Sequence, residues 1–233
     1  MRSPGTPKRL TRVGGYRDRY VEGDDVAARK VLTRAETQAQ TREDLLDAAE
    51  KLFLANGYHV TSIATIAAEA GRTVGAVYSN FANKEELCIE VLKRRSAGEL
   101  SSLITALATS GDDFDGRLDA IAIWWRRVSS QTDVVNLIAE YLLSIVRDLD
   151  RRAEAVETIS RFIESAQAIT EEYLPMGVSP SEEATNEAMH AILATGTGLA
   201  VSQSAGIIGV DESVTLLVKS FKLWMGQLAA SQK

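Results

Sequence analysis

Two short helical segments joined by a glycine constrain the fold of this chain more than any other feature. The first segment begins near Thr61, whose hydroxyl is predicted to cap it, and ends at Gly71. Glycine tolerates the left-handed backbone that a helix end often requires. Thr73 is predicted to cap the second segment, which runs from Val74 to Asn80. A helix, a tight turn and a second helix are typical of motifs that place the second helix in the DNA major groove.

The motif lies within a longer run, from about Thr41 to Leu92, that resembles the N-terminal domain of the TetR/AcrR family of bacterial transcription regulators. The run contains A-N-G-Y at the end of a first helix, then I-A-x-x-A-G, and then V-G-A-V-Y-x-x-F-x-N-K-E-E-L. The resemblance implies a DNA-binding transcriptional regulator. It favours a homodimeric repressor that a small lipophilic ligand releases from a palindromic, double-stranded operator.

The resemblance also assigns residues to the DNA interface. Short side chains at the start of the second helix let its backbone approach base edges, and apolar groups there contact thymine methyls. The base-facing and neighbouring candidates are Arg72, Val74, Gly75, Ala76, Ser79 and Asn80, and the phosphate-binding candidates are Thr61, Thr73, Tyr78 and Lys84. Two interpretations stay open for Arg72. Its guanidinium either binds a guanine or a phosphate, or caps the C-terminus of the preceding helix.

Helical periodicity continues along the chain, and no alternating strand pattern appears, so the predicted fold class is all-α. A first helix is predicted to start near Thr41, with Val26–Gln40 either extending it backwards or forming a separate helix. Asn83 and Glu86 open a long helix to about Ala108. Further helices are predicted at about 113–130, 132–147, 148–173 and 181–205, and a last one capped by Asp211. The predicted units are a basic arm (1–40), a helix-turn-helix domain (41–87) and a ligand-binding and dimerisation domain (88–233).

Charge is unevenly distributed over a chain whose net charge is −6. Residues 1–40 hold nine Lys or Arg and five Asp or Glu, whereas residues 97–233 hold ten and nineteen. The basic arm is predicted to contact the DNA minor groove or backbone; the alternative is a disordered leader without a role. A single cysteine, no secretory signal and no run of about 20 apolar residues predict a cytoplasmic protein without a membrane segment.

The acidic part is predicted to hold a pocket for a lipophilic ligand, because aromatic and methionine side chains accommodate such molecules. The candidates are Trp124, Trp125, Tyr141, Leu142, Phe162, Tyr173, Met189 and His190, with Met176 in a nearby loop. The competing interpretation is that most of these side chains form an ordinary core. For His190 it is a surface or interface histidine rather than a polar anchor.

Small residues recur every four positions near the C-terminus and predict close approach of two helices. The resemblance implies a dimer in which the last two helices of each copy form a four-helix bundle. The interface candidates are Ala194, Gly198, Ser202, Phe221, Trp224 and Leu228. The alternative is that the small-residue face packs within its own domain.

Enzymatic chemistry finds little support in the sequence. His59 and His190 lack a metal-ligating companion at helical spacing, and Cys88 has no activating base beyond Lys84. We therefore expect no catalytic residue, no metal and no cofactor. The alternatives within DNA binding are an activator or a ligand-independent regulator. The alternative from another class is an all-α enzyme or protein-interaction module with a vestigial DNA-binding head.

Overall fold

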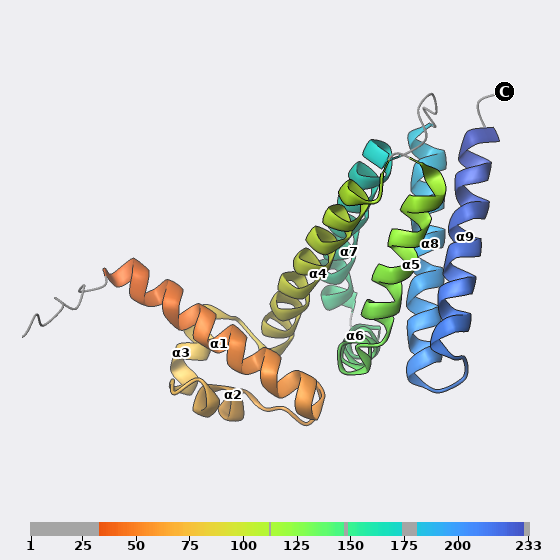
Figure 1. The fold of residues 1–233 in the computed structure, drawn as a ribbon. Helices are drawn as coiled ribbons and strands as arrows, with labels where there is room; N and C mark the ends of the chain where they lie inside the picture. Colours follow the sequence, from red (N-terminus) through yellow and green to blue (C-terminus); the bar gives the residue numbers. More distant parts are fainter. Residues whose placement is uncertain (1–32, 112, 147–148, 174–180, 231–233) are drawn as a thin grey trace, which may run out of the picture.

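The computed structural model describes residues 33–111, 113–146, 149–173 and 181–230, and within these residues it contains nine helices and no strand. The all-α prediction is therefore confirmed (Figure 1). The helices are α1 (Arg34–Asn56), α2 (Ile63–Glu69), α3 (Val74–Asn80), α4 (Lys84–Thr109), α5 (Phe114–Ser129), α6 (Thr132–Ile145), α7 (Leu149–Tyr173), α8 (Glu182–Ser204) and α9 (Val210–Ala230).

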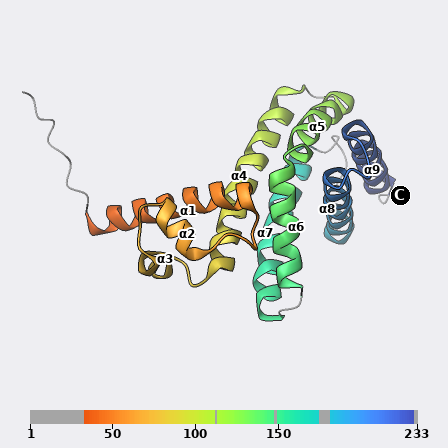
Figure 2. The ribbon, with the colours of Figure 1, turned by 90° about the horizontal axis from the view of Figure 1, so that it is seen from below.

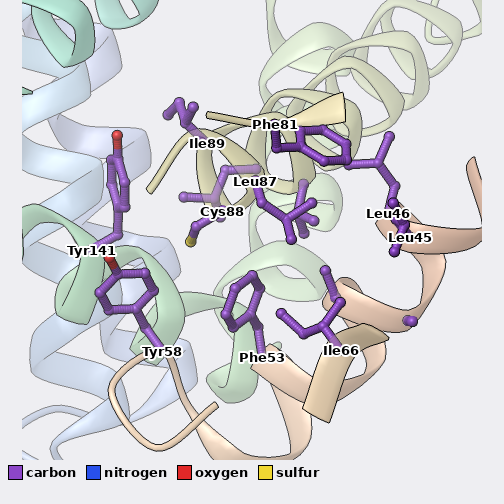
Figure 3. Packing of buried hydrophobic residues seen from close by; sticks show 14 of the residues in the cluster. Leu45, Leu46, Phe53, Tyr58, Ile66, Phe81, Leu87, Cys88, Ile89 and Tyr141 are labelled. Carbon is purple, nitrogen blue, oxygen red and sulfur yellow. The ribbon is translucent and has the colours of Figure 1, made fainter. Parts of the chain in front are cut away.

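Helices α1 to α3 form a small unit at one end of the molecule, here called the head (Figure 1). Its core joins buried side chains of α1, α2 and α3, such as Val77, to the first turns of α4. Figure 3 shows Phe53, Ile66 and Leu87 in this core. The same core also takes Leu137, Tyr141 and Ile145 from α6. The predicted boundary between residues 87 and 88 thus falls inside α4, and α6 belongs to both packing units.

Helix α1 starts earlier than predicted. Thr33 is its N-cap, and a capping box joins the Thr33 hydroxyl to the Glu36 N–H and the Glu36 carboxylate to the Thr33 N–H. The predicted start at Thr41 is wrong, because the Thr41 hydroxyl donates to the Thr37 carbonyl inside the helix. The backward extension considered for Val26–Gln40 is present from Arg34 onward; residues 1–32 lie outside the described part of the chain.

The caps of the next helices mostly match their predictions. Thr73 caps α3 and Asn83 caps α4, each accepting a hydrogen bond from an N–H three residues on. The predicted cap at Thr61 is wrong, because Ser62 caps α2 and accepts from the Thr65 N–H. Gly71 has φ of 62°, as expected of the glycine that ends this helix.

The body consists of α4 to α9. Helices α8 and α9 run alongside each other on the side of the molecule opposite the head (Figures 1 and 2). Most predicted helix ends lie within one or two residues of the observed ends. Asp211 was expected to cap α9 but lies inside its first turn, since α9 starts at Val210. None of the described helices has the length and apolar character that crossing a bilayer requires.

Candidate nucleic-acid interface and internal cavity

Helix α3 presents one face to solvent while its other face is anchored in the head. Val77 is fully buried and the C-cap residue Phe81 is nearly so. Val74 and Tyr78 are 42% and 57% exposed, and Gly75 and Ser79 share their face. Large exposed apolar and aromatic groups on a short helix are typical of a binding surface rather than of a core element. Of the sequence-predicted residues on α3 and its cap, Thr73, Val74, Gly75, Tyr78 and Ser79 are therefore accessible.

Hydrogen bonds within α3 occupy part of the polar groups that were predicted to face DNA. The Ser79 hydroxyl donates to the Gly75 carbonyl, and the Asn80 amide donates to the Ala76 carbonyl. The Thr73 hydroxyl accepts from the Ala76 N–H, so its own hydrogen is left for a phosphate. Ala76 and Asn80 are half-buried and contribute less to the surface than their neighbours.

Arg72 adopts an arrangement that neither sequence interpretation included. Its Nη2 lies 2.5 Å from Oδ2 of Asp44 in α1, and both side chains are about one-third exposed. Hydrogen bonds from Arg72 and then from Gln40 hold the pKa of the Asp44 carboxyl below its ordinary value. The ion pair ties the turn before α3 to the middle of α1 and so fixes the direction in which α3 points.

The side chains of Thr61 and Lys84 form hydrogen bonds inside the head. The Thr61 hydroxyl lies 2.8 Å from the Gly57 carbonyl and donates within a site that is 4% exposed. Lys84 Nζ donates to the carbonyls of Tyr58 and Thr61 at 2.8 and 3.0 Å and lies over the Tyr58 ring. The Thr61 hydroxyl is thus not placed to bind phosphate, whereas Lys84 has one further N–H to offer.

All cationic side chains between residues 41 and 96 already have partners within the described structure. Acidic side chains pair with Arg42, Lys51, Arg72, Lys93, Arg94 and Arg95, and main-chain carbonyls bind Lys84. The same segment carries seven Lys or Arg against eight Asp or Glu. The excess positive charge of the N-terminal part of the chain therefore lies in residues 1–40.

Glu140 of α6 joins the body to the head, and the sequence analysis missed it. Its carboxylate accepts from the main-chain N–H groups of Tyr58 and His59 at 2.7 and 3.2 Å. Gly57 has φ of 84°, and a Cβ there would lie 2.8 Å from the same carboxylate. The Tyr58 ring meets the Tyr141 ring edge-on (Figure 3). The A-N-G-Y run signalled only a helix end, so nothing local pointed to this contact.

A second connection runs from α1 to the start of α6. Glu50 accepts from Arg94 and Arg95; burial raises its pKa, but these two bonds outweigh burial and lower it overall. Arg95 also donates to the Gln131 side-chain oxygen at 2.7 Å, and the Gln131 amide donates to Glu99 at 3.2 Å. The network links the head to the wall of a cavity in the body.

The cavity has a volume of about 330 Å³ and is bounded by residues of all six body helices. Four predicted pocket residues line it: Trp124, Trp125, Phe162 and Met189. Tyr141 and Leu142 do not, because they pack in the head core and against it. His190 is exposed on α8 with Nδ1 2.7 Å from the Asn186 carbonyl, so it is not a pocket anchor. The side chain of Tyr173 and residue Met176 lie outside the described residues.

The predicted interface residues divide between two environments. Ala194 and Gly198 are exposed on α8, and the exposed apolar side chains of these two helices include Val201 on α8 and Leu223 on α9. Ser202 is half-buried. In contrast, Leu228 is 2% exposed in the protomer core, Trp224 packs against that core, and Phe221 lines the cavity. These three residues of α9 thus pack within the protomer.

Cys88 is buried, as expected of a structural cysteine. Removal from solvent raises the pKa of its thiol to about 12, so the thiol is protonated at neutral pH. The sole cysteine of the chain therefore serves the head core and has no nucleophilic role.

Comparison with known proteins identifies the head. Residues 45–91 match the family model described as bacterial regulatory proteins, tetR family. The HTH-type regulator YxaF of Bacillus subtilis is 32% identical over 98 residues, which are 42% of this chain and 49% of that protein. The HTH-type regulator AcrR of Shigella flexneri is 43% identical over 70 residues, 29% of this chain and 32% of that protein. The chain thus spans half or less of the length of these two relatives.

Solved structures extend the likeness to the body. A TetR-family transcriptional regulator from Streptomyces coelicolor superimposes with a TM-score of 0.61 at 16% identity, covering 81% of this chain and 99% of that one. The fatty acid degradation regulator FadR from Bacillus halodurans gives 0.60 at 18% identity, covering 79% and 97%. At these identities the likeness shows the fold. The family that matches the head and these relatives are regulators rather than enzymes, and residues 45–91 of this chain are similar to the tetR family of bacterial regulatory proteins.

Proposed function

We propose that this chain is a DNA-binding transcriptional regulator that acts as a homodimeric repressor and leaves its operator when a lipophilic ligand enters the body. One observation carries the proposal. Helices α4 and α6 both line the cavity, and both also pack into the core that holds α3. A binding surface and an apolar cavity thus share two rigid elements.

DNA binding rests on the exposed face of α3. Val74, Gly75 and Ala76 bring the helix start close to base edges, and the hydroxyls of Thr73 and Tyr78 flank it as phosphate donors. Release of Arg72 from Asp44 would let its guanidinium reach a base or phosphate. Two copies of α3 in one dimer would enter successive major grooves about 34–36 Å apart.

Ligand response rests on helices that contact both the cavity and the head core. On α6, Val135 lines the cavity, Leu137 and Tyr141 pack in the head core, and Ile138 contacts both. On α4, Leu92 faces both regions. A ligand that favours a different position of either helix also favours a different position of the head. Operator and ligand then weaken each other's binding by the same factor.

Dimerisation through α8 and α9 is the third part of the proposal. The exposed faces of these helices combine small residues, Ala194 and Gly198, with the apolar side chains of Val201, Leu216 and Leu223. Apolar surface of this kind rimmed by polar residues is typical of a protein interface. Of the predicted interface residues, the proposal keeps Ala194, Gly198 and Ser202.

Activation of transcription, rather than repression, is the second candidate function. The HTH-type transcriptional activator FasR of Mycolicibacterium smegmatis is 30% identical over 101 residues, 46% of that protein. A relative of this chain is thus named an activator, and the position of the operator relative to a promoter would decide between activation and repression.

The test begins with the purified full chain and random double-stranded DNA, from which bound fragments are selected and sequenced. We expect a palindromic consensus bound by two copies. A compound screen then scores melting temperature and operator release together, because a ligand specific for the folded state raises its melting temperature. Failure to enrich any sequence would contradict DNA recognition. Stabilising compounds that never release the operator would contradict the ligand response alone.

A further inference from the structure

Ser129, at the C-terminal end of α5, is the unusual polar residue of the cavity wall. It is 0% exposed, it lines the cavity, and its Oγ has no hydrogen-bond partner among the described residues. A buried hydroxyl without a partner is less favourable in free energy than one that is hydrogen-bonded. The free energy lost here would be recovered by a group that enters the cavity and hydrogen-bonds to Ser129.

Neighbouring hydroxyls behave differently. The adjacent Ser130 donates to the Arg126 carbonyl at 2.7 Å, and Thr197, on the α8 part of the same wall, donates to the Leu193 carbonyl at 2.9 Å. Bonds of this type, to a carbonyl one turn earlier, are the usual solution for a helical serine or threonine. Ser129 does not use it, although its own carbonyl accepts from the Gln203 amide.

The charges around this end of the cavity are already balanced. Arg95 is paired with Glu50, Glu99 is paired with Arg127, and Gln131 bridges Arg95 and Glu99 through both ends of its amide. A ligand group with a net charge would find no unpaired countercharge there and would lose its hydration. The site therefore favours an uncharged hydrogen-bonding group.

The remainder of the cavity is long and mainly apolar, and Arg117, near the Phe114 end of α5, is the charged residue on that part of the wall. Its wall follows α4 from Leu92 to Leu107 and α5 from Ser129 back to Phe114. Each of these two helical segments is about 22 Å long at a rise of 1.5 Å per residue. Aromatic, leucine and methionine side chains dominate the wall between these ends. This shape suits a hydrocarbon chain more closely than a compact polar molecule.

We propose that the cavity takes an elongated hydrocarbon ligand that carries an uncharged hydrogen-bonding group, such as an alcohol, at the end near the head. Ser129 Oγ is the specificity-determining contact for that group. The inference rests on the proposed function, since it names the ligand class of the same cavity. It adds that the polar end of the ligand lies beside the Glu50–Arg95–Gln131 network, which reaches α1 of the head.

The experiment compares three probes of equal chain length, decanol, decanoate and decylammonium, on the full chain. Calorimetry measures affinity, and gel shift on the selected operator measures release. We expect decanol to bind most tightly to the wild type. Ser129→Ala should weaken decanol binding about fivefold, equal to about 1 kcal/mol, without changing the affinity of the two charged probes. Ser130→Ala, the matched control, should leave all three affinities unchanged.

Folding of the variant is checked separately. Ser129→Ala removes no hydrogen bond that the structure contains, so the ligand-free variant should melt at or above the wild-type temperature. Decanoate or decylammonium binding as tightly as decanol would overturn the inference. So would unchanged decanol affinity in Ser129→Ala, which would indicate that a buried water satisfies the hydroxyl. Release of the operator by another class of compound would then leave the proposed function standing.

Discussion

Individual side chains decide what the α3 surface offers to DNA. Tyr78 projects freely, whereas Arg72 is held by Asp44 and Lys84 is held by two main-chain carbonyls. The difference matters because a paired cation must break an existing bond before it can bind a phosphate. Tyr78 therefore provides the most direct test of the interface, and Arg72 tests how the head is held together.

Tyr78→Ala should weaken binding to all DNA sequences about tenfold, because a hydrogen bond to a phosphate is a sequence-independent contact. Tyr78→Phe keeps the ring and removes the hydroxyl, so it separates packing from hydrogen bonding. Gel shifts on operator and on unrelated DNA measure both. Wild-type affinity in Tyr78→Ala would remove this residue from the interface. Lys84→Ala is a less specific probe, since it should lower head stability as well as affinity.

The Asp44–Arg72 pair predicts a pH effect on stability. The pKa of Asp44 is lower in the folded state than in the unfolded state, so its contribution is complete above about pH 4, the unfolded pKa. The contribution is lost as the pH falls through the folded pKa. The Asp44→Asn variant should therefore have a lower melting temperature than the wild type at pH 7. This gap in melting temperature should shrink below about pH 4. A gap that is constant from pH 7 to pH 3 would show that the charge plays no part.

At the scale of elements, α6 is the helix that belongs to two units. One face lines the cavity, and Leu137, Tyr141 and Ile145 complete the head core (Figure 3). Glu140 adds two hydrogen bonds to the loop between α1 and α2. Together with the hydrogen bonds from Lys84 of α4 to the same loop, Glu140 is expected to hold the head in one orientation.

Glu140→Ala should lower the free energy of unfolding by about 1–2 kcal/mol, because two main-chain N–H groups lose a charged acceptor. Urea titration followed by circular dichroism measures the change. The control is Glu157→Ala, whose carboxylate makes an exposed pair with Arg161 one turn away in α7. The control should change stability by no more than about 0.5 kcal/mol. Equal effects of the two substitutions would mean that the junction adds nothing specific.

Two properties concern the whole molecule rather than a single head or cavity. They are the association of two copies and the attraction of the chain to DNA. The exposed face of α8 and α9 lies on the side opposite the head, where pairing would leave both heads free (Figures 1 and 2). The described cations of the head are paired, and the positive excess lies in residues 1–40. Each property leads to a measurement.

Gly198→Leu should convert the proposed dimer to a monomer and abolish operator binding. A Cβ at Gly198 meets nothing within 4 Å, so the protomer itself tolerates the side chain, whereas a tight interface would lose about 1–3 kcal/mol. Gly98→Leu is the matched control, because this α4 glycine is equally exposed and open. Light scattering reports the mass. A fully dimeric Gly198→Leu protein would place the interface elsewhere.

Replacing Lys8, Arg9 and Arg12 with glutamine should weaken DNA binding and reduce its salt dependence. Each phosphate contact contributes about 0.9 to the slope of log affinity against log salt concentration. The slope is measured by titration at several salt concentrations on operator and on unrelated DNA. If the basic arm contacts the DNA backbone, the affinities for operator and for unrelated DNA should fall by the same factor. An unchanged slope would mean that these residues make no phosphate contact.

Local chemistry explains why helices and most of their ends were predictable from the sequence. Capping at Thr73 and Asn83 and termination at Gly71 depend on residues within four positions, and hydrophobic spacing reports the buried face of each helix. The family motif then placed α3 on the surface. Of the two failed caps, Thr61 lies next to the true N-cap, Ser62, where adjacent hydroxyl residues compete for the same role, whereas Asp211 lies inside the first turn of α9.

Contacts between distant segments could be identified only from the tertiary structure. Glu140 contacts Tyr58 across 82 positions and Arg72 contacts Asp44 across 28, and Ser129 is unusual only because its hydroxyl has no partner among the described residues. No periodicity distinguishes Tyr141, which joins the head core, from Trp125, which lines the cavity, since both are aromatic residues on the buried face of a helix. Helix formation is governed by near neighbours along the chain, whereas the choice of partner for a buried side chain depends on how the helices pack.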